Sequence, residues 1–418
     1  MPELSERPGR LICNWESDRI TITCRYLRER DRQVKGEIII TTAIPGIKSP
    51  ILTTDYNFSS AQTRSKLAKE LEELVALPTV NWRLLLEQLS ELVPARFRAG
   101  EPMVELMLGG KPQPPKWLLE PLLQENQPTV LFGEGGSGKS TLVKGLAICL
   151  SLGWIDNPLG IAVLDDRYKI AYLDWEADSV ASAWQHTALL AGFGLPVSPL
   201  LYRRCSRPLA DDIDAVQHWI GEFQTNIVIV DSLALAAGGE LNSSETATRF
   251  FEALRSLKQS AFIIAHQAKD PNVKRKTIYG NVFFTNLARC VWQVTKSQER
   301  GRDQPLYLRL DDEKHNYSSQ YEPLGFKLTY GPERDWIRIE STDADAVKER
   351  REEQGYTPAI IQALKEAGKL STKDLVAQVG GNPQSLRQVL YRLKGKGIIV
   401  SVPSGGKDAY WGLPALEV

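Results

Sequence analysis

The chain has 418 residues, more than the about 250 to 300 at which one hydrophobic core stops growing, so we expect two or three domains. Lys plus Arg and Asp plus Glu both number 51, so the overall charge argues neither for nor against a nucleic-acid partner. The five cysteines lack a Cys-x-x-Cys pair and there are four histidines, which indicates neither a disulfide framework nor a zinc cluster; most of the cysteines should be buried. Because a signal-peptide core and an apolar stretch of about 20 residues are both lacking, we expect a cytoplasmic protein without a membrane partner.

Residues 1–110 predict a small α+β domain. Residues 11–55 alternate apolar and polar side chains, as half-buried strands do. Two helical segments follow, the second of them beginning after Asn81 as N-cap. A linker rich in Gly, Pro and Lys at 109–116 leads to the next domain. The sequence does not indicate a role for this N-terminal domain.

Residues 133–141 read Gly-Glu-Gly-Gly-Ser-Gly-Lys-Ser-Thr, the pattern of a phosphate-binding loop. An apolar strand precedes this loop and a helical pattern follows it, which is the context that the pattern requires. Glycines allow backbone N–H groups to turn towards phosphates, the lysine supplies a charge to the β- and γ-phosphates, and the serine hydroxyl can ligate Mg²⁺. We therefore predict ATP and Mg²⁺ as cofactors, with these binding residues: Gly133, Glu134, Gly135, Gly136, Ser137, Gly138, Lys139, Ser140 and Thr141.

Residues 111–345 alternate short apolar runs with helical patterns, which is typical of a parallel α/β sheet. We expect strands at 129–133, 170–174, 199–203, 226–231 and 261–266, followed by hairpin-like strands near 289–295, 305–311 and 323–330.

Acidic residues at two strand ends predict the chemistry. Asp231 ends an apolar strand and is the predicted second Mg²⁺ ligand beside Ser140; the alternative is the cap of a strand-to-helix loop. Residues 173–178 contain three acids close together. Glu176 has a side chain long enough to orient the attacking water, whereas Asp174 is fixed as the last residue of the strand. The alternative is that these acids cap the helix that begins at Ser179.

The strand that ends at His266 and Gln267 finishes in polar side chains rather than turn residues. Either side chain could hydrogen-bond the γ-phosphate and report its loss, or be a structural group at a strand end. Directly afterwards, a loop broken by Pro271 carries Lys269, Lys274, Arg275 and Lys276. Such a loop is suited to gripping the phosphates of a single strand, with a merely solvated loop as the alternative.

Residues 346–418 are predicted to form a linker and a winged-helix domain. The charge run at 347–353 is interpreted as a solvated linker or a helix start. A first helix at 359–367, a second opening at Asp374 after a capping box and a third after Asn382 are followed by a hairpin with its turn at 403–408. From residue 356 onwards there are eight Lys and Arg against four acids. The predicted DNA contacts on the third helix are Arg387, Arg392, Lys394 and Lys396.

Four motifs follow one another in order: Gly133–Thr141, Leu173–Glu176, Ile227–Ser232 and Ile264–Gln267. Over residues 117–330 they resemble the RecA-like ATPases, and more narrowly the RepA-type (AAA_25-like) group of plasmid replicative helicases and related phage ATPases. The expected fold is α/β: a RecA-like P-loop NTPase core with a small α+β N-terminal domain and a C-terminal winged-helix domain.

The resemblance also implies a homo-oligomer, such as a hexamer, with single-stranded DNA at the ATPase core. One subunit's basic residue would then reach its neighbour's nucleotide, and the candidates for this finger are Lys314 and Arg289. The chain departs from related hexameric helicases in having Asn316 where they often carry an arginine, and in its winged helix, which is not general to the group.

Together these features favour an ATP-hydrolysing DNA-binding protein, namely an oligomeric DNA-dependent ATPase or helicase in replication or mobile-element DNA metabolism. The alternative is an ATP-switched regulator or loader, without unwinding activity, whose winged helix binds duplex DNA. A small-molecule kinase is disfavoured by the polar strand end at 266–267, the basic loop and the winged helix.

Overall fold

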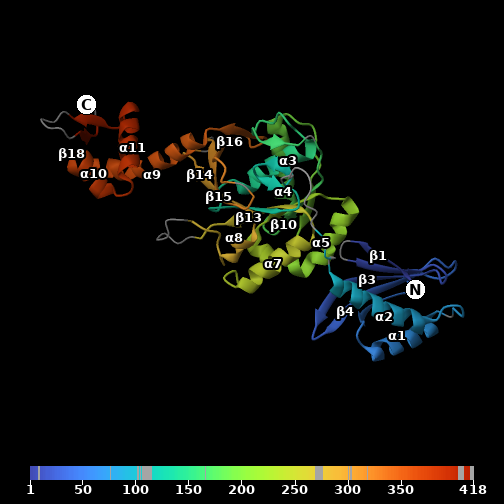
Figure 1. The fold of residues 1–418 in the computed structure, drawn as a ribbon. Coiled ribbons are helices and arrows are strands. Elements are labelled where there is room, and N and C mark those ends of the chain that lie inside the picture. The colour runs from blue at the N-terminus through green and yellow to red at the C-terminus, as the bar shows by residue number, and fades with distance from the viewer. Residues whose placement is uncertain are drawn as a thin grey trace. The chain divides into compact units, whose positions relative to one another are not determined.

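The computed structural model describes residues 1–7, 10–75, 77–100, 103, 105, 115–164, 166–268, 276–299, 301, 304–317, 319–402 and 409–414 (Figure 1). The chain divides into two compact units: Met1–Pro114 with Ala210–Gln224, and Pro115–Leu209 with Thr225–Val418. All five cysteines are buried free thiols, as predicted for most of them. Among the helices of the described residues, none is long and apolar enough to cross a membrane.

The first unit contains an antiparallel sheet in which each strand pairs with the next along the chain. Its strands are β1 (Glu3–Arg7), β2 (Arg10–Trp15), β3 (Ile20–Arg30), β4 (Gln33–Thr42) and β5 (Leu52–Asn57). Two helices, α1 (Ala61–Leu74) and α2 (Trp82–Ala99), lie along one face of this sheet (Figure 1). The alternation of apolar and polar residues buries every second side chain, and Asn81 caps α2 by accepting from the Leu84 amide at 3.0 Å. Most of α5 (Leu209–Phe223) also belongs to this unit.

The second unit is built on a nine-stranded sheet with the order β11-β10-β12-β13-β8-β14-β15-β16-β17. The strands from β11 to β14 are parallel, and the last three are antiparallel. Their bounds are β8 (Pro128–Gly133), β10 (Ile170–Asp174), β11 (Leu201–Arg204), β12 (Ile227–Asp231), β13 (Ser260–His266), β14 (Cys290–Ser297), β15 (Leu306–His315), β16 (Leu324–Tyr330) and β17 (Ile337–Thr342). The eight strands expected from the sequence are confirmed to within a few residues; β17 was not predicted.

Helices and a small sheet complete the core of this unit. The helices are α3 (Lys139–Leu152), α4 (Ser179–Phe193), α6 (Leu233–Ala237), α7 (Ser244–Ser256) and α8 (Phe283–Leu287), and the small sheet has the strands β6 (Trp117–Glu120), β7 (Leu123–Gln124) and β9 (Ala162–Val163). Strands β8 and β12 are buried at every residue because a parallel sheet is covered on both faces. The carboxyl ends of β8, β10, β12 and β13 therefore share one edge of the sheet.

The C-terminal part follows the order α9 (Ala344–Ala367), β18 (Lys369–Ser371), α10 (Thr372–Val379), α11 (Pro383–Gly395), β19 (Val400–Val402) and β20 (Tyr410–Gly412). The three strands form a sheet of order β18-β20-β19, and this part has an apolar core of its own that includes Ile360, Leu390 and Trp411. Helix α10 begins at Thr372, two residues before the predicted start, because Ser371 is its N-cap. The predicted hairpin turn at 403–408 lies outside the described residues.

The charge run at 347–353 is wholly helical, which confirms the helix-start alternative and makes the linker alternative wrong. Its helix, α9, begins at Ala344, well before the predicted residue 359. Several of these charged side chains have partners although most of the run remains exposed: Glu349 lies 2.9 Å from Arg392, Glu353 pairs with Lys396, and the Arg350 guanidinium lies 4.6 Å from the centre of the Tyr307 ring. Exposed pairs of this kind add little stability, so the helix also depends on buried residues such as Val347.

Candidate ATP site

The loop between β8 and α3 has the geometry of an anion cradle. Gly133, the last residue of β8, pairs with His266 on one side and Val294 on the other, and a Cβ at this position would lie 2.2 Å from the Val294 carbonyl oxygen. Gly138 is the N-cap of α3 and has a φ of 77°, which favours glycine. The first amide groups of α3 are therefore available to a phosphate at the positive end of the helix.

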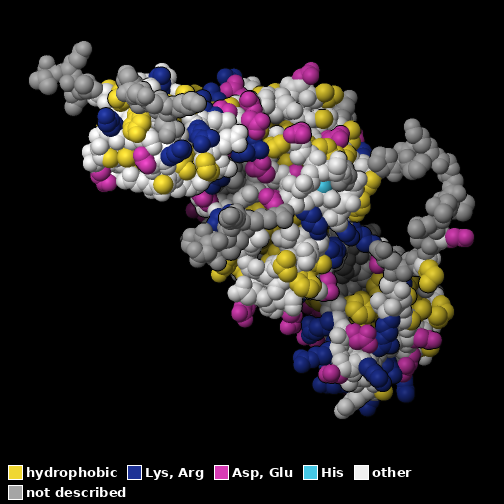
Figure 2. Space-filling model, turned by 60° about the vertical axis from the view of Figure 1, so that its left-hand side comes forward, with side chains coloured by type: hydrophobic (Ala, Val, Ile, Leu, Met, Phe, Trp, Pro, Cys, Tyr) yellow, Lys and Arg dark blue, Asp and Glu magenta, His cyan; other side chains and the backbone are white. Residues whose placement is uncertain are grey.

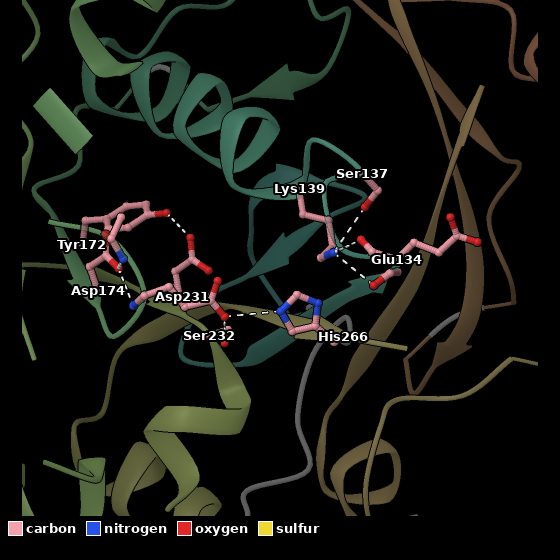
Figure 3. A network of polar contacts seen from close by, with 11 residues as sticks. Glu134, Ser137, Lys139, Tyr172, Asp174, Asp231, Ser232 and His266 are labelled. Carbon is pink, nitrogen blue, oxygen red and sulfur yellow. Dashed lines mark hydrogen bonds and ion pairs between the residues drawn. The ribbon is translucent and has the colours of Figure 1, made fainter. Parts of the chain in front are cut away.

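Lys139 is folded over this loop (Figure 3). Its amine donates to the carbonyl oxygens of Gly133 and Glu134, at 3.0 and 2.7 Å, and to Ser137 Oγ at 3.2 Å. The residue is only 4% exposed, and burial lowers the pKa of the amine to about 8, against the opposing effect of the Asp231 and Glu176 carboxylates. A bound triphosphate would replace neutral carbonyl partners by charged oxygens and so hold the ammonium form.

Asp231 and Ser140 fit a magnesium ion. Ser140 lies close enough to lower the pKa of the Asp231 carboxyl, and both residues offer hard oxygen ligands of the kind that Mg²⁺ prefers. Asp231 is 6% exposed, and burial raises the pKa of its carboxyl, so a nearby cation would relieve an unfavourable desolvation. Among the described residues no group of three His, Cys, Asp or Glu could hold a metal, so phosphate oxygens and water would complete the coordination.

Asp174 and Glu176 differ in burial and in partners, while the third acid, Asp178, is the N-cap of α4, which confirms the capping alternative for that residue. Asp174 is 1% exposed, and its Oδ1 accepts from the amides of Glu176 and Ala177 at 2.9 and 2.8 Å, so it shapes the turn after β10. Glu176 is exposed, and its Oε1 accepts from Ser232 Oγ and lies 3.3 Å from His266 Nε2. The His266 contact is the main cause that lowers the pKa of the Glu176 carboxyl, so the carboxylate form is favoured.

His266 and Gln267 lie at the junction of this site with the basic loop. Gln267 donates to Glu134 Oε1 at 3.4 Å. The chain returns after the loop to form an isolated bridge between Gln267 and Ile278, and the Tyr279 amide donates to the His266 carbonyl oxygen at 2.8 Å. The two ends of the loop are therefore held together beside Glu134 and Glu176.

Four residues at the site were not singled out from the sequence. Tyr172 donates its hydroxyl to Asp231 Oδ2, Ser232 contacts Glu176, and Lys144 lies over the Tyr172 ring. Lys296, on β14, donates to the Gly136 carbonyl oxygen at 3.1 Å. Tyr172 and Lys144 stand within apolar runs, where residue spacing alone predicts core positions. Their partners come from other elements and are seen only in the folded chain.

The two finger candidates are not brought to the nucleotide site of their own chain. Lys314 pairs with Val291, which pairs with Val130 near the start of β8, whereas the phosphate loop begins at the other end of that strand. The Lys314 amine donates to the carbonyl oxygens of Thr285, Asn286 and Ala288. Arg289 lies close enough to lower the pKa of this amine, after burial as the main cause. Their role towards a neighbouring subunit stays a prediction.

The predicted nucleic-acid contacts divide into three sets. In the basic loop, Lys276 is partly exposed, and the other three residues lie outside the described part of the chain: Lys269, Lys274 and Arg275. On α11, Arg387 and Lys394 are exposed, whereas Arg392 and Lys396 pair with Glu349 and Glu353 of α9. Two of the four positive charges on α11 are thus partly neutralised within the chain.

Comparison with known proteins supports the nucleotide site. Residues 94–272 match the family model AAA_25, described as an AAA domain. A KaiC-like protein from Pyrococcus horikoshii OT3 is similar in structure, with 13% identity, a TM-score of 0.37 and coverage of 53% of this chain and 93% of the other. The flagellar accessory protein FlaH from Methanocaldococcus jannaschii has 18% identity, a TM-score of 0.34 and coverage of 52% and 90%. No curated protein matches the sequence. The phosphate loop at 133–141 thus lies within the residues that resemble an AAA domain.

Proposed function

We propose that the chain is a DNA-dependent ATPase that works as a homo-oligomer, belongs to the RepA-type group and acts on single-stranded DNA. One observation carries the proposal: the residue that contacts the candidate catalytic carboxylate also opens the basic loop. His266 lies 3.3 Å from Glu176, and the loop at 269–276 begins three residues later. DNA bound to this loop would therefore act on the hydrolytic site through His266 and Gln267.

The residues of the site support in-line attack of water on the γ-phosphate. Glu176, ionised and exposed, orients the water and accepts its proton. Lys139 moves from its backbone carbonyl partners to the β- and γ-phosphate oxygens, where its charge stabilises the transition state. Ser140 and Asp231 would hold Mg²⁺, which neutralises charge on the phosphate oxygens when it is bound.

The first test is steady-state ATP hydrolysis by the full chain without DNA, with single-stranded DNA and with duplex. We expect single-stranded DNA to raise kcat about 10-fold or more, because a strand bound to the loop at 269–276 would shift His266 and with it the Glu176 carboxylate that it contacts. The double variant Lys274→Ala, Arg275→Ala should keep the basal rate and lose most of the stimulation. If kcat of the wild-type chain is the same with and without single-stranded DNA, the proposal is contradicted. A measurement of the molecular mass in solution, with and without nucleotide, tests whether the chain forms a homo-oligomer.

A second candidate is favoured by the C-terminal part, which we propose to be a winged helix that binds duplex DNA. The element order and three-stranded sheet support this, and Figure 2 shows Lys and Arg side chains on the surface of this part, at the upper left. Helix α11 begins with Asn382, which accepts from the Gln384 and Ser385 amides, and presents Arg387 and Lys394 to solvent. In this alternative the ATPase switches a DNA-binding regulator or loader.

Substitutions on α11 separate the two candidates. Arg387→Ala with Lys394→Ala should lower duplex affinity and reduce the slope of log K against log salt by about 2, because two phosphate contacts are lost. Arg392→Ala with Lys396→Ala is the matched pair and should have a smaller effect, because these charges already face Glu349 and Glu353. Loss of all DNA binding in the first variant would favour the regulator, while stimulation by single-stranded DNA that persists would favour the motor.

A further inference from the structure

We propose that Lys144 is a positioning residue, which holds the metal-binding carboxylate of Asp231 in place through Tyr172. The inference rests on the proposed ATPase function. Lys144 lies in α3 one turn after Ser140 and is 2% exposed. A buried ammonium group is unfavourable unless its charge and its hydrogen bonds are satisfied, so its partners indicate what it does.

The amine of Lys144 is held at three points. It donates to Ser182 Oγ at 2.9 Å and to Gln185 Oε1 at 2.7 Å, both on α4. It also lies 4.6 Å from the centre of the Tyr172 ring on β10. The electron-rich face of the ring attracts the cation, and a buried contact of this kind is strong because water does not compete. One side chain therefore ties together α3, α4 and β10.

Tyr172 transmits this arrangement to the metal ligand (Figure 3). It is fully buried, and its hydroxyl donates to Asp231 Oδ2 on the neighbouring strand β12. A cation over the ring withdraws electron density from the phenol, which strengthens the hydroxyl as a donor. With Oδ2 held in this way, the carboxylate of Asp231 keeps one orientation, and Oδ1 remains for the cation beside Ser140.

Gln185 extends the same network to the phosphate loop. Its amide nitrogen donates to Thr141 Oγ1 at 2.7 Å while its oxygen accepts from Lys144. Lys144 is thus linked by one intermediary to Thr141 on the phosphate loop and by another to Asp231. The two parts of the metal site, on α3 and β12, are positioned by one buried charge. Its contribution is to the geometry of metal binding, since its amine contacts neither nucleotide-binding residues nor Asp231 directly.

The test is Mn²⁺ binding to the full chain with a non-hydrolysable ATP analogue, measured by electron paramagnetic resonance, together with ATP hydrolysis. Lys144→Met keeps the side-chain volume and Tyr172→Phe removes one oxygen atom. Each is expected to weaken Mn²⁺ affinity about 10-fold, as loss of a residue that orients a ligand does. The affinity for the analogue without metal should change less than about twofold. The Mn²⁺ affinity of the double variant should be at most about twofold lower than that of the more affected single variant. Lys169→Met, at an exposed lysine before β10, should match wild type.

Two results would overturn the positioning role. One is wild-type Mn²⁺ affinity in Tyr172→Phe, which tests the link even where Lys144→Met does not fold. The other is a double variant whose loss equals the product of the single losses, which would show that the two residues act independently. The wild-type chain could bind Mn²⁺ with the analogue and hydrolyse ATP, and both single variants could match its Mn²⁺ affinity and its rate. In that case only the positioning role of Lys144 fails. If the wild-type chain binds no metal–nucleotide complex, the proposed function fails as well.

Discussion

Glu176→Gln is expected to reduce ATP turnover by about 10²- to 10⁴-fold while ATP affinity changes less than about threefold. The amide keeps the shape of the side chain and an oxygen that can accept from Ser232 Oγ, so the surrounding contacts survive. It cannot accept a proton from the attacking water, so the step that needs a base is lost. Single-turnover hydrolysis and equilibrium binding of a fluorescent ATP analogue measure the two effects separately.

Asp178→Asn is the matched control for this variant. Asp178 is a neighbouring exposed acid whose Oδ1 caps α4 by accepting from the Ala181 amide at 2.8 Å, and an asparagine oxygen can do the same. Turnover should therefore stay within about twofold of wild type, as for a surface change that keeps its cap. If the Glu176→Gln variant retains a third of wild-type turnover, Glu176 is not the general base.

The site could be predicted from the sequence because a parallel sheet brings strand ends together. Asp231, Glu176 and His266 are far apart along the chain, but each stands at or just past the carboxyl end of an apolar strand. The register then aligns Asp174 with Asp231 on neighbouring strands and His266 with Gly133. A pattern that predicts each strand therefore also predicts that these side chains share one edge.

The supporting residues could not be predicted in this way. Lys144 occupies a buried position between apolar residues of α3, and its compensating partners, Tyr172, Ser182 and Gln185, come from two other elements. Similarly, Glu349 pairs with Arg392 43 residues later, so local charge patterning indicates a solvated run where the fold forms ion pairs. Such pairs depend on tertiary packing, which the periodicity of a single sequence does not contain.

The affinity for ATP is expected to fall steeply with rising pH, because Lys139 must be charged to bind the triphosphate. Burial lowers the pKa of this amine to about 8 in the free protein, and the phosphates favour the ammonium form in the complex. Below pH 8 the free amine is already protonated, so affinity should change little. Above pH 8 binding must take up a proton, so Kd should rise about 10-fold per pH unit, or about 30-fold from pH 7 to pH 9.5.

Calorimetric titration with MgATP across this range measures the effect, and two variants identify its source. Lys139→Met should bind weakly at all pH values and lose most of the slope, since the titrating charge that meets the phosphates is gone. Burial also lowers the pKa of Lys144 to about 8, but its amine contacts α4 and the Tyr172 ring rather than the phosphate loop. Lys144→Met should therefore bind MgATP more weakly and keep the slope. The opposite result is a pH dependence of Kd that persists in Lys139→Met and vanishes in Lys144→Met. It would mean that the charge of Lys144, and not that of Lys139, governs the affinity for the nucleotide.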